Sequence, residues 1–378
     1  MRTISALALL ALILPTGAWA NPESDRAAEL IRSLGNASYQ TREKASRELL
    51  HLGRAAYPAL VTGTADPDPE VRSRCRQLLP RIFDLELQAR LDAFLADPDG
   101  KKEHDLPGLS RFRKMFGLDK TARDLFVSMI RADGRLMDAV ESQPAQFAEE
   151  KLLVRCSQLL PRIYTRMPTR PQALNQGDVA ELLFLGINPE VSLGPQAIAQ
   201  INQFLYRQEF RAWVTSGDQA DLMKKLLLAW LDKNVGDPNT GYIITNLAQT
   251  LQLKELLEPA LKIASNSKNM PHVRANVLSA VGRLGDKSLL PKLEPLINDT
   301  TQVQQFAFNR LQGWVQVGDV ALAMAVHLSG QKPADYGYEA VKHNPNWINS
   351  YYYLGFENDK KRAAAKAKWK EWQAAQKK

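Results

Sequence analysis

The five histidines are the side chains of this sequence best suited to metal binding or acid–base chemistry: His51, His104, His272, His327 and His343. A zinc site needs three or four converging ligands, and in helical metalloproteases two of them stand four residues apart. No two of these histidines have that spacing. We therefore expect surface or hydrogen-bonded histidines, with no metal, no cofactor and no catalytic residue.

Other chemical signatures are weak or missing. Residues 97–100, with the sequence DPDG, resemble the start of a calcium-binding loop, but the third acidic ligand and the terminal glutamate of an EF-hand are missing. This segment is more typical of a turn. The sequence also lacks a GxSxG motif, a P-loop and a dinucleotide-binding fingerprint. We predict that the protein is not an enzyme; an enzyme on a helical scaffold is the alternative.

The C-terminal segment over residues 359–378 is the one stretch whose pattern indicates surface binding. It holds eight lysines and arginines against two acidic residues, so most of the net charge of +8 lies there. Its alanine and lysine content favours a helix. The candidate surface-binding residues are the lysines and tryptophans of this helix: Lys366, Lys368, Lys370, Trp369 and Trp372.

Two arrangements of this C-terminal helix fit its sequence. In the first, the tryptophans dock on the preceding helices and the lysines face solvent, which closes the end of the fold. In the second, the helix binds anionic lipid or an acidic polymer. Two tryptophans with only alanine beside them make a weak membrane face, so the docked arrangement is favoured and the anionic surface contact is the alternative.

The first twenty residues have the three parts of a secretory signal peptide. Arg2 precedes an apolar run over residues 4–14, and the small-residue triplet at 18–20 provides a cleavage site. The run is too short for a membrane anchor, which needs about 20 apolar residues. We predict a periplasmic or secreted protein with no transmembrane segment after cleavage. Without the signal peptide and the C-terminal segment 359–378, the chain is nearly neutral. This near-neutral charge argues against nucleic acid as a partner.

A ten-residue motif occurs twice, as RCRQLLPRIF at 74–83 and as RCSQLLPRIY at 155–164. In both copies the apolar residues have the spacing of one face of an α-helix. Three matching copies of this face are Val71, Cys75, Leu78, Leu79, Ile82; Leu152, Cys156, Leu159, Leu160, Ile163; and Val273, Val277, Ala280, Val281, Leu284. Two weaker copies are Thr41, Ala45, Leu49, Leu52 and Val303, Ala307, Leu311, Trp314. We therefore expect a helix at each of these places.

The second position of this face is always small: Ala45, Cys75, Cys156, Val277 and Ala307. Where two helices cross closely, a large side chain would hold them apart. We therefore expect Cys75 and Cys156 to be buried free thiols at equivalent positions. A disulfide between them, which export would permit, is the alternative.

The copies of this face are spaced as a helical repeat requires. Starting positions 41 and 71 differ by 30 residues, as do 273 and 303, which leaves room for two helices that bury their apolar faces against neighbouring pairs. The segments TREKASRELLHLG, PEVRSRCRQLL and PHVRANVLSAVGRLGDKSLLPKLEPLIND resemble HEAT or armadillo-type repeats. The segment DVALAMAVHLSGQKPADYGY resembles exported bacterial HEAT-repeat proteins of unassigned function. The resemblance implies an all-α fold, an α-α superhelix or HEAT-like helical solenoid, that binds partners without chemistry of its own.

The predicted organisation follows from these patterns. Its parts are a signal peptide at 1–20, N-terminal HEAT-like repeats at 21–96, a loop at 97–108, a central helical region with degenerate or irregular repeats at 109–235, C-terminal HEAT-like repeats at 236–330, and a cap with the basic tryptophan-containing helix at 331–378. The predicted function is an exported, non-enzymatic α-solenoid scaffold that binds protein or peptide partners. Binding of the envelope surface or a polyanion through the C-terminal helix is the alternative.

Overall fold

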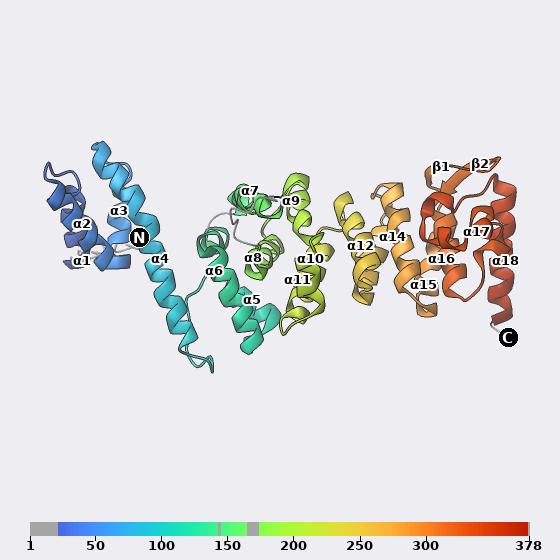
Figure 1. Cartoon of the computed structure of the whole chain (residues 1–378), viewed down its shortest axis with the longest axis horizontal. Helices are drawn as coiled ribbons and strands as arrows, with labels where there is room; N and C mark the ends of the chain where they lie inside the picture. The colour runs from blue at the N-terminus through green and yellow to red at the C-terminus, as the bar shows by residue number, and fades with distance from the viewer. Residues whose placement is uncertain (1–21, 143–144, 165–173, 377–378) are drawn as a thin grey trace, which may run out of the picture. The chain divides into compact units, whose positions relative to one another are not determined.

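The computed structural model describes residues 22–142, 145–164 and 174–376, and the predicted signal peptide lies outside them. The described chain is mostly helical, which confirms the all-α expectation in its coarse form (Figure 1). It divides into two compact units, Met1–Leu106 and Pro107–Lys378. Among the described residues, no helix is both long enough and apolar enough to cross a membrane.

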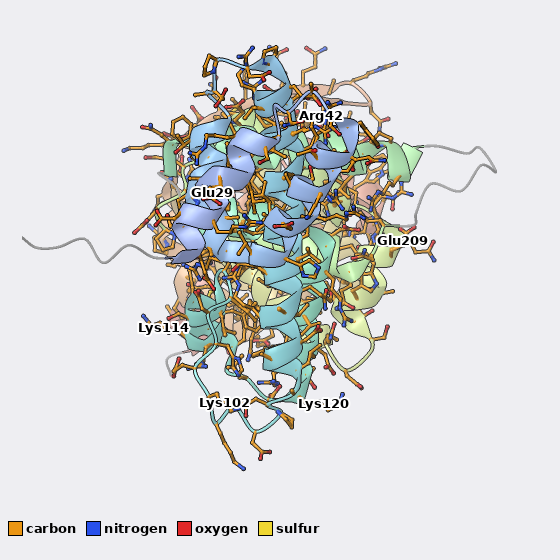
Figure 2. The ribbon with its side chains drawn as sticks, turned by 90° about the vertical axis from the view of Figure 1, so that its left-hand side faces the viewer. Glu29, Arg42, Lys102, Lys114, Lys120 and Glu209 are labelled. Carbon is orange, nitrogen blue, oxygen red and sulfur yellow. The ribbon has the colours of Figure 1, made fainter. Side chains whose placement is uncertain are left out.

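The first unit is built from helices that share one apolar core. These are α1 (Pro22–Ser33), α2 (Tyr39–Leu52), α3 (Tyr57–Gly63) and α4 (Pro69–Leu95). Short polar side chains cap the starts of two of them: Ser38 accepts a hydrogen bond from the Thr41 amide at α2, and Asp68 accepts one from the Glu70 amide at α4. After α4, the segment 97–108 contains no α-helix, and Lys102 lies exposed on it (Figure 2).

The predicted apolar face of α4 is confirmed. Val71, Cys75 and Ile82 are buried on this helix. A Cβ atom placed on Gly63 of α3 would lie 2.5 Å from the Cys75 sulfur, so the helices cross with no room for a larger side chain. Burial raises the pKa of the Cys75 thiol to about 11, which keeps the thiol protonated and unreactive at neutral pH.

The second unit is a longer succession of helices. Its first α-helices are α5 (Leu109–Phe116), α6 (Lys120–Ser142), α7 (Ala148–Tyr164), α8 (Gln176–Gly186), α9 (Pro195–Leu205), α10 (Gln208–Thr215) and α11 (Ala220–Lys233). The later ones are α12 (Pro238–Leu251), α13 (Leu257–Ser265), α14 (Pro271–Leu284), α15 (Leu290–Leu293), α16 (Val317–Leu328), α17 (Glu339–His343) and α18 (Asp359–Gln376).

Helices α12, α14 and α16 pack against one another in that order. A Cβ atom on Gly241 of α12 would lie 2.4 Å from the Val273 side chain of α14. One on Gly282 of α14 would lie 2.1 Å from Met324 of α16. Glycine at these two positions therefore lets the three helices approach closely.

Helix α7 carries the second copy of the ten-residue motif. Leu152, Cys156 and Leu159 are buried on it, as the helical spacing predicts. Cys75 and Cys156 are both buried and free, which confirms the prediction of free thiols. Burial raises the pKa of Cys156 to about 12.

Arg155, the residue before Cys156, is buried against acidic residues of α8. Its guanidinium donates a 2.7 Å hydrogen bond to Asp178 and lies 3.6 Å from a carboxyl oxygen of Glu181. Neither Glu181 oxygen has a hydrogen-bond partner among the described protein atoms. Burial raises the pKa of Glu181 well above its usual range, so this carboxyl group favours its protonated form. The cluster joins α7 to α8.

The predicted helix over residues 303–314 is wrong. These residues form two antiparallel strands, β1 (Gln302–Phe308) and β2 (Leu311–Gln316), joined by Asn309 and Arg310. Asn309 has a φ of 54°, a left-handed conformation that asparagine tolerates and that a two-residue hairpin turn requires.

The physical reason for the hairpin is the composition of its strands. The strands are rich in aromatic or β-branched residues, which fit a pleated surface better than a helix. These residues are Phe306, Phe308, Trp314 and Val315. Ala307, predicted to be a buried small residue, is exposed on β1. The helical spacing in this segment is therefore coincidental.

Candidate functional site

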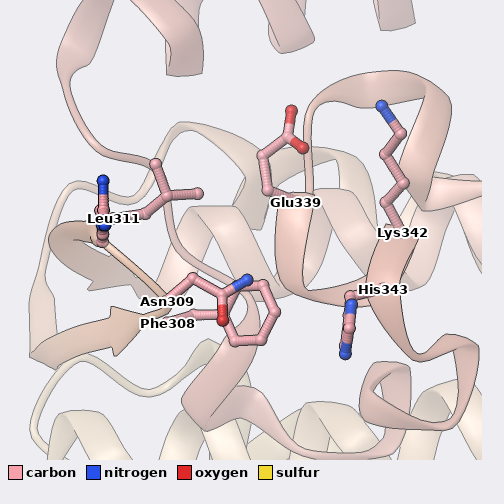
Figure 3. Close-up of a pocket in the computed structure, with 7 residues that line it drawn as sticks. Phe308, Asn309, Leu311, Glu339, Lys342 and His343 are labelled. Atoms are coloured by element: carbon pink, nitrogen blue, oxygen red, sulfur yellow. The ribbon is translucent and has the colours of Figure 1, made fainter.

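A pocket with a volume of about 800 Å³ lies between the hairpin and α17 (Figure 3). Its lining residues come from two short stretches: Phe308, Asn309, Arg310 and Leu311 from the hairpin, and Glu339, Lys342 and His343 from α17. The side chains of Glu339 and Lys342 project from α17 toward the same side (Figure 3). We call this set of seven residues the hairpin pocket.

The base of the hairpin is fixed by packing and by backbone hydrogen bonds. Phe306 and Val315 are buried. The Trp314 and Phe356 backbones exchange hydrogen bonds of 3.3 and 3.4 Å. A Cβ atom on Gly313 would lie 2.2 Å from the Phe356 carbonyl oxygen, so only glycine allows this approach. A rigid base thus holds the exposed turn at the pocket.

Aromatic rings form one side of the hairpin pocket. The Phe308 ring centre lies 5.2 Å from that of His343 and 5.2 Å from that of Trp347, which it meets edge-on. Trp347 belongs to a short 3₁₀ helix (Pro345–Asn349) and stacks on Tyr353 at 4.3 Å. Rings packed in this way offer an apolar surface that is already ordered before a ligand binds.

The exposed charges of the pocket are more basic than acidic. Arg310 and Lys342 are cations, and Glu339 is the one acidic lining residue. Within the described part of the chain, neither Arg310 nor Lys342 forms an ion pair. Guanidinium and ammonium groups bind carboxylates through charge-assisted hydrogen bonds. The pocket can therefore hold an anionic group beside an aromatic surface.

The predicted binding helix, α18, is docked on the second unit. The buried Arg362 donates a 2.7 Å hydrogen bond to Asp319 of α16 and a 3.1 Å hydrogen bond to the Trp314 carbonyl oxygen of the hairpin. Trp369 is 1% exposed, and its indole nitrogen donates to Glu294 at 3.0 Å. This is the arrangement that the sequence favours for the C-terminal helix.

The other candidate residues of α18 differ in their surroundings. Trp372 is half-buried and stacks on Trp369 at 4.8 Å. Lys368 donates to the Asp335 carbonyl oxygen at 2.8 Å, and Lys370 is exposed. Lys366 is half-buried, and burial is the main cause that lowers its pKa. The five residues thus share one helix, but several of their contacts serve its packing.

The histidines have separate surroundings. His104 lies 2.9 Å from Asp97, and this contact is the main reason why the pKa of Asp97 is lowered to about 2. Asp97 also accepts hydrogen bonds from the backbone amides of Lys101 and Lys102, as in a turn. His343, to which the sequence assigns no role, lies in the hairpin pocket. No group of three or more acidic, histidine or cysteine side chains able to hold a metal occurs among the described residues.

The hairpin pocket is the site that sequence reasoning missed. The signal that could have found its turn is Asn309, an asparagine between two aromatic-rich stretches. No local pattern pairs this turn with α17. Comparisons with protein-family models, with curated proteins and with solved structures found no match.

Proposed function

We propose that the protein is an exported, non-enzymatic α-solenoid scaffold that binds a protein or peptide partner through the hairpin pocket. The observation that carries the proposal is the pair of exposed cations, Arg310 and Lys342, which have no ion-pair partner among the described residues and stand beside aromatic rings. Exposed cations that form no ion pair within the chain can bind carboxylates of another molecule. The partner therefore presents acidic groups to this pocket.

Contacts between alternate helices of the second unit support the solenoid part of the proposal. The close approaches of α12 to α14 and of α14 to α16 are those that stacked helical repeats require. Arg274, which follows Val273 in the HEAT-like motif, is buried and donates to the Ala264 carbonyl oxygen at 2.7 Å and to Asp299. This arginine ties α14 to the segments before and after it. Export is proposed from the leader sequence over residues 1–20.

Binding of the envelope surface or a polyanion through α18 is the second candidate, and it has less support. Arg362 and Trp369 are buried in the contact between α18 and the rest of the unit. Lys360 and Lys370 are both exposed, so they could contact another molecule. An enzyme on this scaffold is not favoured by any arrangement of side chains described above.

Two double charge reversals separate the first two candidates. The purified protein is immobilised, and envelope proteins that it retains are compared for the natural sequence, Arg310→Glu/Lys342→Glu and Lys360→Glu/Lys370→Glu. We expect the first pair of changes to abolish retention of a partner that the natural sequence holds, and the second pair to leave it unchanged. The reverse result would favour α18, and equal retention by all three proteins would contradict the proposed site.

A further inference from the structure

Exposed tyrosines continue the aromatic surface away from the hairpin pocket. Tyr352 is 51% exposed, Tyr242 is 43% exposed and Tyr206 is 40% exposed. Tyr352 comes from a 3₁₀ helix that follows α17 (Tyr351–Tyr353), Tyr242 from the N-terminal part of α12, and Tyr206 directly follows α9. Large apolar rings at such exposure are typical of binding surfaces when they gather in one region.

Ring contacts lead from the pocket to the 3₁₀ helix that contains Tyr352. Trp347, which packs on Phe308 of the pocket, stacks on Tyr353 at 4.3 Å. Two residues earlier in the chain, Tyr351 stacks on Tyr352 at 4.3 Å. The 3₁₀ helix of these tyrosines contacts both strands of the hairpin and also α14.

The row continues over the neighbouring helices. Tyr242 lies 6.3 Å from His272 at the start of α14. Helix α9, which Tyr206 directly follows, packs against α12, the helix of Tyr242. Burial raises the pKa of Tyr206, and the Tyr242 hydroxyl adds to this effect. Burial and the hydroxyls of Tyr352 and Tyr242 raise the pKa of Tyr351 in the same way. We call Tyr206, Tyr242, His272 and Tyr352 the tyrosine row.

Charge differs between the two ends of this surface. Arg310 and Lys342 outnumber the single acidic residue, Glu339, at the pocket end, whereas the tyrosine row consists of uncharged phenols and one imidazole. A partner that covers both ends needs carboxylates at one end and apolar groups at the other. An extended polypeptide offers this combination, because its side chains project at regular intervals and its prolyl or aliphatic groups stack on aromatic rings.

We propose that the hairpin pocket and the tyrosine row together bind one extended acidic segment of a partner polypeptide, with its carboxylates at Arg310 and Lys342 and its apolar side chains on the tyrosines. The inference rests on the proposed function and names the chemistry of the partner. We commit to a polypeptide as the source, because its acidic side chains supply carboxylates for the cations and its apolar side chains supply groups that stack on the tyrosines, whereas a neutral glycan carries no carboxylate.

The test is selection of peptides from a random display library on the purified full-length protein. We expect enriched peptides that carry aspartate or glutamate at one end and proline or aliphatic residues at the other. Arg310→Glu/Lys342→Glu should weaken binding of a selected peptide by about tenfold or more, and Tyr242→Ala/Tyr352→Ala by about fivefold. Tyr39→Ala, which changes a 64% exposed tyrosine of the first unit, is the matched control and should have no effect.

Three results would overturn the inference. These are the absence of enrichment, enriched peptides without acidic residues, and peptide affinities that the tyrosine changes leave unaltered. Binding to purified cell-wall polysaccharide that depends on Tyr242 and Tyr352 would assign the row to a glycan instead. If acidic peptides bind through Arg310 and Lys342 alone, the proposed site stands and the inference fails, so the two failures are distinguishable.

Discussion

The hairpin pocket and the C-terminal helix α18 combine the same kinds of residue with opposite surroundings. In α18, Arg362 is buried in an ion pair with Asp319, and the Trp369 indole is buried with a hydrogen bond to Glu294. In the pocket, Arg310 and Lys342 are exposed and form no ion pair within the part of the chain that the structure describes. A basic residue next to an aromatic ring therefore does not indicate binding by itself; the burial and the partner of the charge decide its role.

The comparison predicts a large stability effect at the centre of the α18 contact. Trp369→Ala should lower the free energy of unfolding by about 3–5 kcal/mol, because it removes a fully buried ring and leaves Glu294 without its indole donor. Denaturant unfolding measures the loss. The matched change Trp372→Ala, at a half-buried ring, should cost clearly less, and equal losses would mean that the two rings are equally buried in solution.

Loss of the buried ion pair should have a comparable effect. Arg362→Ala should cost about 3 kcal/mol, because it leaves the Asp319 carboxylate buried without its cation. Adding Asp319→Asn should restore part of this stability. A double variant no more stable than Arg362→Ala would show that the pair does not anchor α18.

The base of the hairpin joins the two regions and should affect both stability and binding. Gly313→Ala places a methyl group where the Phe356 carbonyl oxygen lies, so we expect a loss of about 1–3 kcal/mol. The displaced hairpin should also weaken binding of the partner. Normal binding by a destabilised Gly313→Ala protein would show that the pocket does not depend on the Phe356 contact.

The smallest predicted effect concerns Lys366 of α18. Burial lowers its pKa, so the folded state releases this proton more easily than the unfolded state does. The free energy of unfolding should therefore rise with pH between the lowered pKa of Lys366 in the folded state and its usual pKa of about 10.4 in the unfolded state. Lys366→Met should remove that rise. At neutral pH the change should alter stability by less than about 0.5 kcal/mol. Unfolding curves of both proteins between neutral and alkaline pH check the difference.

The helical core could be read from the sequence because its signal is local. Val71, Cys75 and Ile82 repeat at the helical period, and their burial on α4 follows from that spacing. The hairpin could not be predicted from its local sequence, because Val303 and Ala307 also have the spacing of one helix face. Its strands are stabilised by contacts with a residue far along the chain, Phe356, which no local pattern reveals.

The candidate site shows the same limit. The lysines and tryptophans of α18 stand out in the sequence because they are close together, whereas the hairpin pocket combines residues of two separate segments. The contrast between a buried Arg362 and an exposed Arg310 depends on the tertiary structure alone. The composition therefore predicted binding by α18, the more basic segment. Arg362 of this helix is instead buried in a packing contact with Asp319.

Site-specific photocrosslinking from Asn309 tests the central claim most directly. A photoreactive amino acid replaces Asn309, which lies in the turn of the hairpin and lines the pocket. In a control protein it replaces Lys370 on the exposed face of α18. We predict that the Asn309 position crosslinks to an acidic segment of a protein partner and that the Lys370 position does not. Crosslinks from Lys370 alone, or equal crosslinks from both positions, would contradict the assignment of binding to the hairpin pocket.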